Sequence, residues 1–128
     1  MDLAGLGAIP EGEVLRLTIV MVPGKQITIA HIISNPDKIL YDKLALNPGL
    51  DYQEDSAIGI ISIMPAEAAV IAGDISIKMA KIQPAIIDRF RGTLIFSGHV
   101  ADVRTAINTV RSHLGQDLDF WVPSVTVS

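Results

Sequence analysis

The stretch from Ala57 to Gly98 constrains the fold most, because four elements follow one another in it with little connecting sequence. Residues 57–63 form a nearly continuous apolar run, which is typical of a strand buried on both faces. A helix rich in small residues is predicted over 65–80, and two strands are predicted at 85–89 and 93–97. This order favours an α+β fold in which helices cover a sheet.

The helix predicted over 65–80 has three kinds of residue at helical spacing. Larger apolar side chains share one face with an alanine, at Met64, Ala68, Ile71, Ile75 and Met79. Charged side chains share another, at Glu67, Asp74, Lys78 and Lys81. Small residues keep the helix thin, at Ala66, Ala68, Ala69, Ala72 and Gly73. We therefore expect this helix to lie close to a sheet or to a neighbouring molecule.

The sequence before this block predicts a lead-in, two strands and a short helix. Residues 1–13 are rich in Gly and Ala and are expected to form a flexible lead-in, whereas apolar and polar residues alternate over 14–22 as in a strand. The more apolar face of that strand carries Leu15, Leu17, Ile19 and Met21. A turn at Pro23-Gly24 separates it from a second predicted strand at 26–33.

A helix start is predicted at Asn35-Pro36-Asp37, with Asn35 as the capping residue and Pro36 in the first helical position. Asn47-Pro48-Gly49 is expected to end that helix.

The C-terminal third predicts a long helix and an edge strand. Apolar residues recur at helical spacing at Val100, Val103, Ile107, Val110 and Leu114. Gly115 is the expected end of this helix. Residues 120–127 form the last predicted strand, and Pro123 within it indicates the edge of the sheet.

Composition excludes several classes of function. The chain has 128 residues, enough for one domain, a net charge of −4 and only 5% aromatic residues, so a nucleic-acid groove is not expected. No apolar run is long enough for a membrane span, and no signal peptide is expected at the start of the sequence. The absence of cysteine fits a reducing cytosol. A mean hydropathy of +0.42 is high for a small soluble chain and favours an obligate oligomer.

The residues that could carry chemistry do not form a catalytic pattern. His31, His99 and His113 are predicted in a strand, a loop and a helix end, without the spacing of metal ligands, so structural roles are favoured. The glycines at Gly5-Leu6-Gly7 and Gly24-Lys25 lack the spacing of a phosphate-binding loop. We therefore expect no metal, no cofactor and no catalysis.

Three segments carry a family resemblance in their order and spacing: Val22–Ala30, Ile71–Lys78 and Asp88-Arg89-Phe90. Over roughly residues 22–114 the chain resembles the circularly permuted shell proteins of bacterial microcompartments, of the ethanolamine- and propanediol-utilisation type. The resemblance implies a permuted shell domain over 23–128, in which the strand and helix that end the common version come first. It also implies cyclic hexamers that tile into a shell together with other shell proteins and enclose enzymes.

The resemblance assigns roles to particular residues. The strand at 14–22 would join a six-stranded parallel barrel, with Leu15, Leu17, Ile19 and Met21 facing inward, that caps a central pore. Lys78 would lie at the edge between hexamers, where Asn35 replaces the usual accompanying arginine. The residues nearest the pore axis would be Arg89, Phe90, Arg91 and Gly92. A ring of six arginines would favour anions.

One segment resembles the glycyl-radical compartment subfamily in particular. Some members of that subfamily carry a Gly-x-Cys-Gln-Pro segment whose cysteine supports an iron–sulfur cluster. This chain reads Ala80-Lys81-Ile82-Gln83-Pro84, so the Gln-Pro is present and Ile82 stands at the cysteine position. No cluster is expected without the thiolate.

Two functions from different classes fit these observations. The first is a structural, non-enzymatic shell subunit of a cytoplasmic bacterial microcompartment, with no nucleic acid or membrane as partner. The second is a small cytosolic α+β protein that oligomerises and binds a ligand or regulates. The two are separated by whether the chain assembles into hexamers and sheets.

Overall fold

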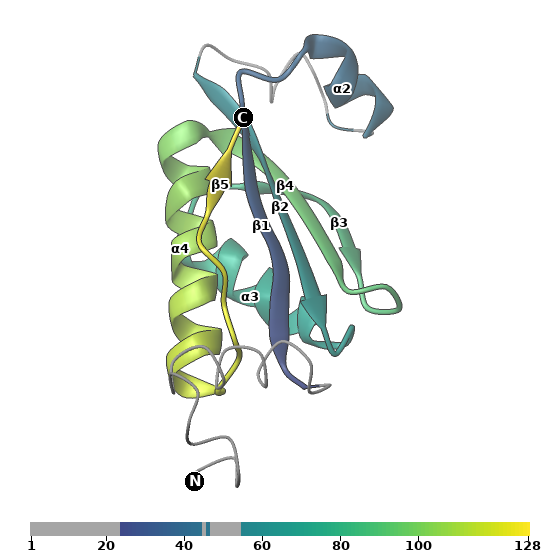
Figure 1. The fold of residues 1–128 in the computed structure, drawn as a ribbon. Coiled ribbons are helices and arrows are strands. Elements are labelled where there is room, and N and C mark those ends of the chain that lie inside the picture. The colour runs from purple at the N-terminus through teal and green to yellow at the C-terminus, as the bar shows by residue number, and fades with distance from the viewer. Residues whose placement is uncertain (1–23, 45, 47–54) are drawn as a thin grey trace, which may run out of the picture.

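The computed structural model describes residues 24–44, 46 and 55–128, and these residues form an α+β domain (Figure 1). Its elements are β1 (Gln26–Ser34), α2 (Lys38–Lys43), β2 (Ser56–Met64), α3 (Ala68–Met79), β3 (Gln83–Asp88), β4 (Thr93–His99), α4 (Val100–Asp117) and β5 (Thr126–Val127). The strands form one sheet in the order β3-β4-β2-β1-β5. All neighbouring strands are antiparallel except β1 and β5, so the sheet is mixed.

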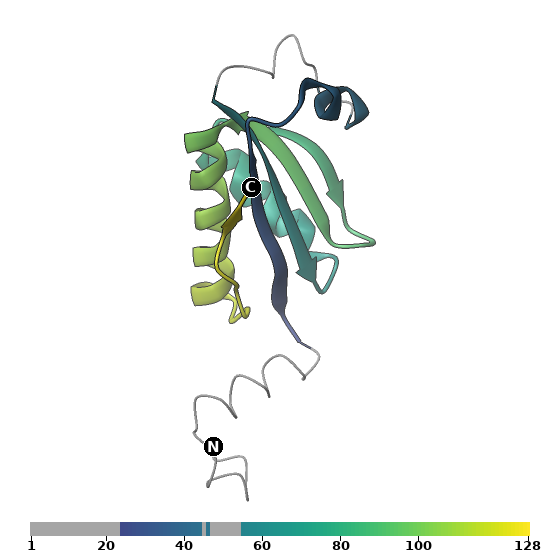
Figure 2. The same cartoon turned by 45° about the horizontal axis from the view of Figure 1, so that its top comes forward.

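The main core lies between the sheet and two helices. Figures 1 and 2 show α3 and α4 on one side of the sheet, while α2 lies apart at one end. Alternate residues of β2, among them Ile61 and Ile63, point into this core, and Phe96 of β4 joins them. Every apolar residue predicted for the buried face of α4 contributes to the same core, fully buried except for the partly buried Val100. Burying such a side chain stabilises the fold by about 1.5–3 kcal/mol.

A second, smaller cluster lies on the other face of the sheet, under α2. Its buried members are Tyr41, Leu46 and Ile58. The Tyr41 hydroxyl donates to Ser56 Oγ at 2.9 Å, so its buried oxygen has a partner. This cluster covers only the end of the face that lies near α2.

The face of α3 that packs on the core is made of small residues: Ala68, Ala69, Ala72, Gly73 and Ser76. The predicted close approach is confirmed, because a Cβ on Gly73 would come within 2.9 Å of the Ile87 side chain. The face with the larger apolar residues is not buried as a unit. Ile71 and Met79 are about half exposed, and only Ile75 packs partly against the core. Small side chains occupy the inner face of α3 because the helix lies too close to the sheet to leave room for branched side chains.

The short helix α2 begins and ends elsewhere than predicted. Its capping residue is Asp37, whose carboxylate accepts a hydrogen bond from the Ile39 N–H at 3.0 Å. Asn35 cannot cap it, because Asn35 lies two residues earlier in a left-handed turn with φ 47°. The helix ends at Lys43, before the predicted stop. The prediction chose the wrong capping residue, because the side chains of Asn35 and Asp37 can both accept a hydrogen bond from a backbone N–H.

The last helix runs past Gly115 to Asp117, so the predicted end at that glycine is wrong. The chain turns at Asp119, which has φ 60°, and the Phe120 N–H then donates to the Leu114 carbonyl at 2.8 Å. A left-handed Asp supplies the turn that was assigned to glycine.

The final strand is at the edge of the sheet, as predicted, but it is far shorter than residues 120–127. Only Thr126 and Val127 pair with β1, and Trp121 makes one isolated bridge to Gln26. Between these points the Pro123 carbonyl accepts from Arg111 Nε of α4 at 2.7 Å. The segment is therefore tied alternately to the sheet and to the helix.

Candidate pore and assembly surfaces

The residues predicted near the pore axis form the turn between β3 and β4. The Asp88 carboxylate accepts from the backbone N–H groups of Phe90 and Arg91 at 2.8 and 3.1 Å. The Gly92 N–H donates to the Asp88 carbonyl at 2.8 Å, and Gly92 has φ +76°, which favours glycine. These bonds fix the tip of the hairpin, so the side chains that it carries have a defined place.

The turn also lowers the pKa of the Asp88 carboxyl from its ordinary value. Hydrogen bonds from the Phe90 N–H and then the Arg91 N–H lower the pKa of its carboxyl, and the Arg91 charge adds to this. Asp88 is therefore a carboxylate that stabilises the turn between β3 and β4.

The hairpin tip carries an aromatic side chain that is unusually exposed. Phe90 is 79% exposed, and the Arg89 guanidinium lies 4.9 Å from the centre of its ring. Arg91 is exposed as well. The structure thus brings together the four predicted pore residues at one end of the sheet, with two cations and one ring facing solvent.

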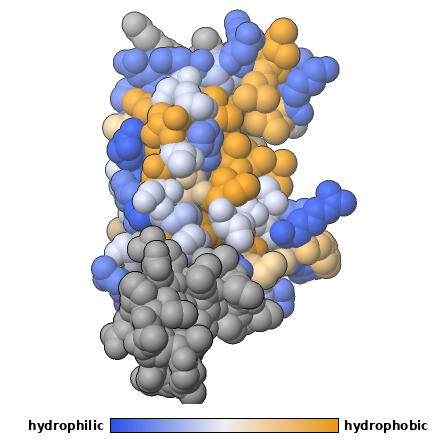
Figure 3. Space-filling view, in the orientation of Figure 1, coloured by the Kyte–Doolittle hydropathy of each residue, from blue (hydrophilic) through white to orange (hydrophobic). Residues whose placement is uncertain are grey.

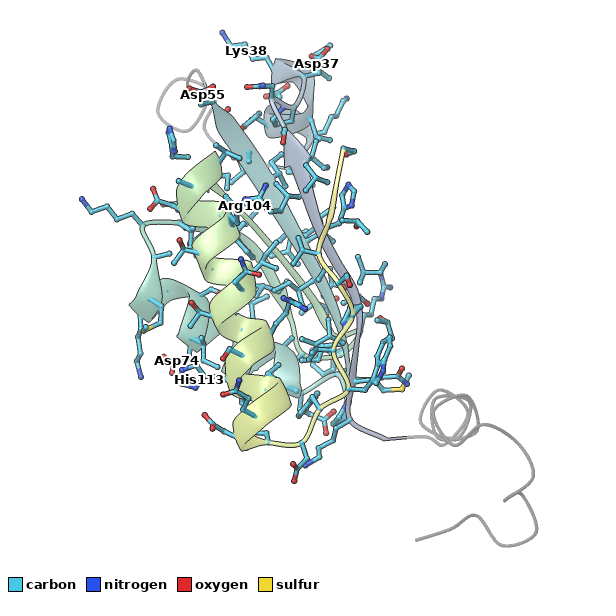
Figure 4. The ribbon with its side chains drawn as sticks, turned by 60° about the vertical axis from the view of Figure 1, so that its left-hand side comes forward. Asp37, Lys38, Asp55, Asp74, Arg104 and His113 are labelled. Atoms are coloured by element: carbon cyan, nitrogen blue, oxygen red, sulfur yellow. The ribbon has the colours of Figure 1, made fainter. Side chains whose placement is uncertain are left out.

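The predicted edge residue Lys78 lies on the outer side of α3. Its Nζ is 2.9 Å from an Asp74 carboxylate oxygen, and both side chains are largely exposed. Figure 4 shows Asp74 on the side of the molecule away from the C-terminal segment. Such an exposed pair contributes little to folding, at most about 1 kcal/mol, and leaves both groups accessible to a partner.

Asn35 lies at the other end of the sheet from the hairpin tip. Its N–H donates to the Ser56 carbonyl at 2.9 Å, where β1 ends and β2 begins. Its left-handed backbone makes it part of a turn, and its side chain is exposed. The predicted barrel residues Leu15, Leu17, Ile19 and Met21 lie outside the described residues.

The histidines have structural partners, as predicted. His31 contacts Thr126 Oγ1 at 2.6 Å and Ser128 Oγ at 2.8 Å through its two ring nitrogens, and so holds the C-terminal segment on β1. His99 Nδ1 caps α4 by accepting from the Ala101 N–H at 3.2 Å. His113 pairs with Asp117 at 3.1 Å. Within the described ranges, no three His, Asp or Glu side chains are placed to hold a metal ion.

A hollow of about 380 Å³ lies between α4 and the C-terminal segment. Its lining includes Arg111, Phe120 and Val122. The guanidinium of Arg111 already donates to the Pro123 carbonyl and, at 3.2 Å, to Asn108 Oδ1. The hollow is the gap between α4 and the C-terminal segment, which pack against each other. The guanidinium of Arg111 bridges these two elements.

One surface was missed by the sequence analysis. Residues 57–63 predicted a strand buried on both faces, but in the single chain Ile60 and Ser62 are only partly buried. Met64, the residue that follows this run, is half exposed. The nearly continuous apolar run at residues 57–63 was the sequence signal that could have predicted this surface. It indicates that one face of β2 is completed by something outside this chain.

The fold and these surfaces, taken together, define a small α+β domain with a mixed sheet and exposed apolar faces. Among the described residues, no helix combines the length and the apolar character needed to cross a bilayer. The model of the BMC domain family matches residues 57–125, which span β2 to the C-terminal segment.

Relatives of known type cover nearly the whole domain. The chain is 42% identical over 105 residues to the bacterial microcompartment shell protein PduU of Salmonella typhimurium, covering 82% of this chain and 86% of the relative. It is 38% identical to the shell protein CutR of Streptococcus intermedius, over 91% of this chain and 96% of that protein. The solved CutR flat hexamer superposes with a TM-score of 0.75 at 36% identity, covering 84% of this chain and 86% of that one. The chain therefore belongs to the BMC-domain family, whose relatives found here are microcompartment shell proteins.

Proposed function

We propose that this protein is a structural, non-enzymatic shell subunit of a bacterial microcompartment. The observation that carries the proposal is the match to PduU and CutR along most of both chains. The exposed apolar residues on the sheet and on α3 support it, because a monomer in water gains nothing by displaying them.

The assembly unit is a cyclic hexamer that tiles with others. The CutR flat hexamer, which shares this fold, supports that state. Light scattering on the purified chain tests it: a mass of six subunits is expected, and a monomer at micromolar concentration would refute the proposal.

The domain is a permuted version of the family fold. The family match begins at residue 57, whereas β1 and α2 precede that point and β1 pairs with β2 in the middle of the sheet. An interior strand that precedes the matched segment is what a permutation would produce.

Residues 14–22 form the capping barrel over the pore in this proposal, with Leu15, Leu17, Ile19 and Met21 inward. Deleting residues 1–21 tests this role. The hexamer should survive, since the described domain begins with β1, and an axial opening should appear by electron microscopy. A truncated chain that unfolds or aggregates as a monomer would show that the segment belongs to the domain core.

The hairpin tip lines the pore and selects anions. Six copies of Arg89 and Arg91 around one axis would raise the local concentration of negatively charged solutes. In hexamers from which residues 1–21 have been deleted to remove the cap, replacing both by Gln should shift the reversal potential in planar bilayers towards cations. Arg104→Gln, an exposed change on α4, is the matched control. An equal shift in the Arg104→Gln control would show that the hairpin tip does not line the pore.

A further inference from the structure

A row of isoleucines crosses the face of the sheet opposite α3 and α4. Ile86 of β3 pairs with Ile95 of β4, and Ile95 pairs with Ile60 of β2. Paired residues lie on the same face, so the three side chains form one row across three strands. We call this row, together with Ile29 of β1 and Met64 of β2, the open-face patch.

The open-face patch is not a surface built for water. An antiparallel sheet with one solvated face normally alternates apolar and polar residues, with the polar ones outward. Here Ile29 is 48% exposed, Met64 49% and Ile86 37%. Ile60 and Ile95 are partly buried against the α2 cluster, so the patch continues that smaller core beyond the edge of the helix.

The shape of the molecule suits an inserted partner. Figure 3 shows apolar side chains gathered over the sheet where the surface is hollowed, between α2 and the β3–β4 hairpin. The patch leads directly to the hairpin, because Asp88 pairs with Thr93 one row beyond Ile86 and Ile95. A partner seated there would be close to the tip that carries Phe90.

We infer that the open-face patch is covered by the next copy of this chain within the hexamer. This inference rests on the proposed function, since the occupant is a second copy in the ring. A cyclic ring joins unlike surfaces, so the open-face patch of one subunit would meet a different surface of the next subunit. Obligate contacts of this kind are the most apolar ones, and the open-face patch has apolar members on four strands.

The outer side of α3 suits a different contact. Val70, Ile71 and Ile77 are about half exposed there, but the Asp74–Lys78 ion pair lies among them on the same helix. A mixed surface of this kind fits a reversible, salt-sensitive contact between hexamers. The two apolar surfaces are thereby assigned to two interfaces, one inside the ring and one between rings.

The absence of cysteine from the chain allows a direct test. Single variants Ile29→Cys and Val70→Cys place a thiol at positions with nearly equal exposure in one subunit, 48% and 50%. Each is labelled with a maleimide in the hexamer at low protein concentration, and the rate is divided by the rate for the same variant in concentrated urea. The normalised rate at Ile29→Cys should be about tenfold slower or more than at Val70→Cys. Ile86→Cys is a second open-face variant in case the first fails to assemble.

The outcomes separate the possible occupants. Equal normalised rates at both positions in an intact hexamer would overturn the inference while leaving the hexamer itself established. Protection at Ile29→Cys that disappears when residues 1–21 are deleted, with the hexamer intact, would assign the patch to the chain's own N-terminal segment and overturn the inference. A monomeric wild-type chain would overturn both the inference and the proposed function.

Discussion

The two faces of the sheet carry the same kinds of residue and meet different surroundings. Ile60 and Ile61 are neighbours on β2 and point to opposite faces. Ile61 is fully buried under α3 and α4, whereas Ile60 is only partly covered in the single chain. The comparison shows that apolar character alone does not distinguish a residue that holds the domain together from one that joins it to a neighbour.

The difference lies in what covers each face. The long helix α4 and the thin helix α3 close the inner face within one chain, and α2 closes only the end of the outer face. Folding and assembly should therefore respond to different substitutions, and the following predictions use that separation, starting with the largest effect.

Ile61→Ala should lower the free energy of unfolding by about 2–5 kcal/mol, because it leaves a cavity in the main core. Ile60→Ala is the matched variant on the other face, and its effect should be smaller and depend on protein concentration. Urea unfolding followed by the fluorescence of the single tryptophan measures both. Equal, concentration-independent losses would show that the two faces do not differ in this way.

Gly92→Ala, a change in the turn between β3 and β4, should lower the free energy of unfolding by about 2 kcal/mol or more. The residue has φ +76°, and an added Cβ would collide with the Ile63 backbone. Gly115→Ala is the control, since its Cβ would meet Val122 at an ordinary 3.5 Å and the change favours helix by about 0.5–1 kcal/mol. Thermal unfolding of the two variants should move in opposite directions.

The hairpin tip should lose stability in acid. The pKa of Asp88 is lowered from its ordinary 3.8, so its ionised form stabilises the folded state above pH 3.8, and this stabilisation is lost as the pH falls through the lower, folded-state pKa. NMR titration of the Asp88 carboxyl should give a pKa below 3.8. Asp88→Asn should flatten the acid limb of the stability curve while keeping the turn, and a pKa at or above 3.8 would contradict the bonded turn.

Lys78→Ala should leave folding nearly unchanged, within about 1 kcal/mol, because its ion pair is exposed. If Lys78 joins hexamers, sheet or tube formation should decline while light scattering still shows a hexamer. Asp74→Ala is the control, since it breaks the same pair and keeps the lysine. Equal loss of sheets in both variants would place the function in the pair itself, and no loss in either would make Lys78 an ordinary solvated residue.

Sequence reasoning predicted the elements well where periodicity and breakers agree. The strand at β2 and the buried stripe of α4 are both confirmed. It was wrong at the end of α4, where Gly115 was chosen although Asp119 supplies the left-handed turn, and at the cap of α2, where Asp37 replaces Asn35. Several residue types can accept a backbone hydrogen bond or adopt a left-handed turn, so local sequence does not decide between neighbouring candidates.

The family resemblance, and with it the type of protein, followed from the sequence because a few segments hold their order and spacing. The sequence also determined that residues 57–63 require cover on both faces. Only the tertiary structure decided which face receives that cover within the chain. The small residues of α3 bring it close to the sheet and leave Val70, Ile71 and Ile77 outside, while the strand register aligns Ile86, Ile95 and Ile60 on the open face. Distances between elements and alignment across strands are properties of packed surfaces, and a linear pattern specifies the residues but not the neighbours they meet.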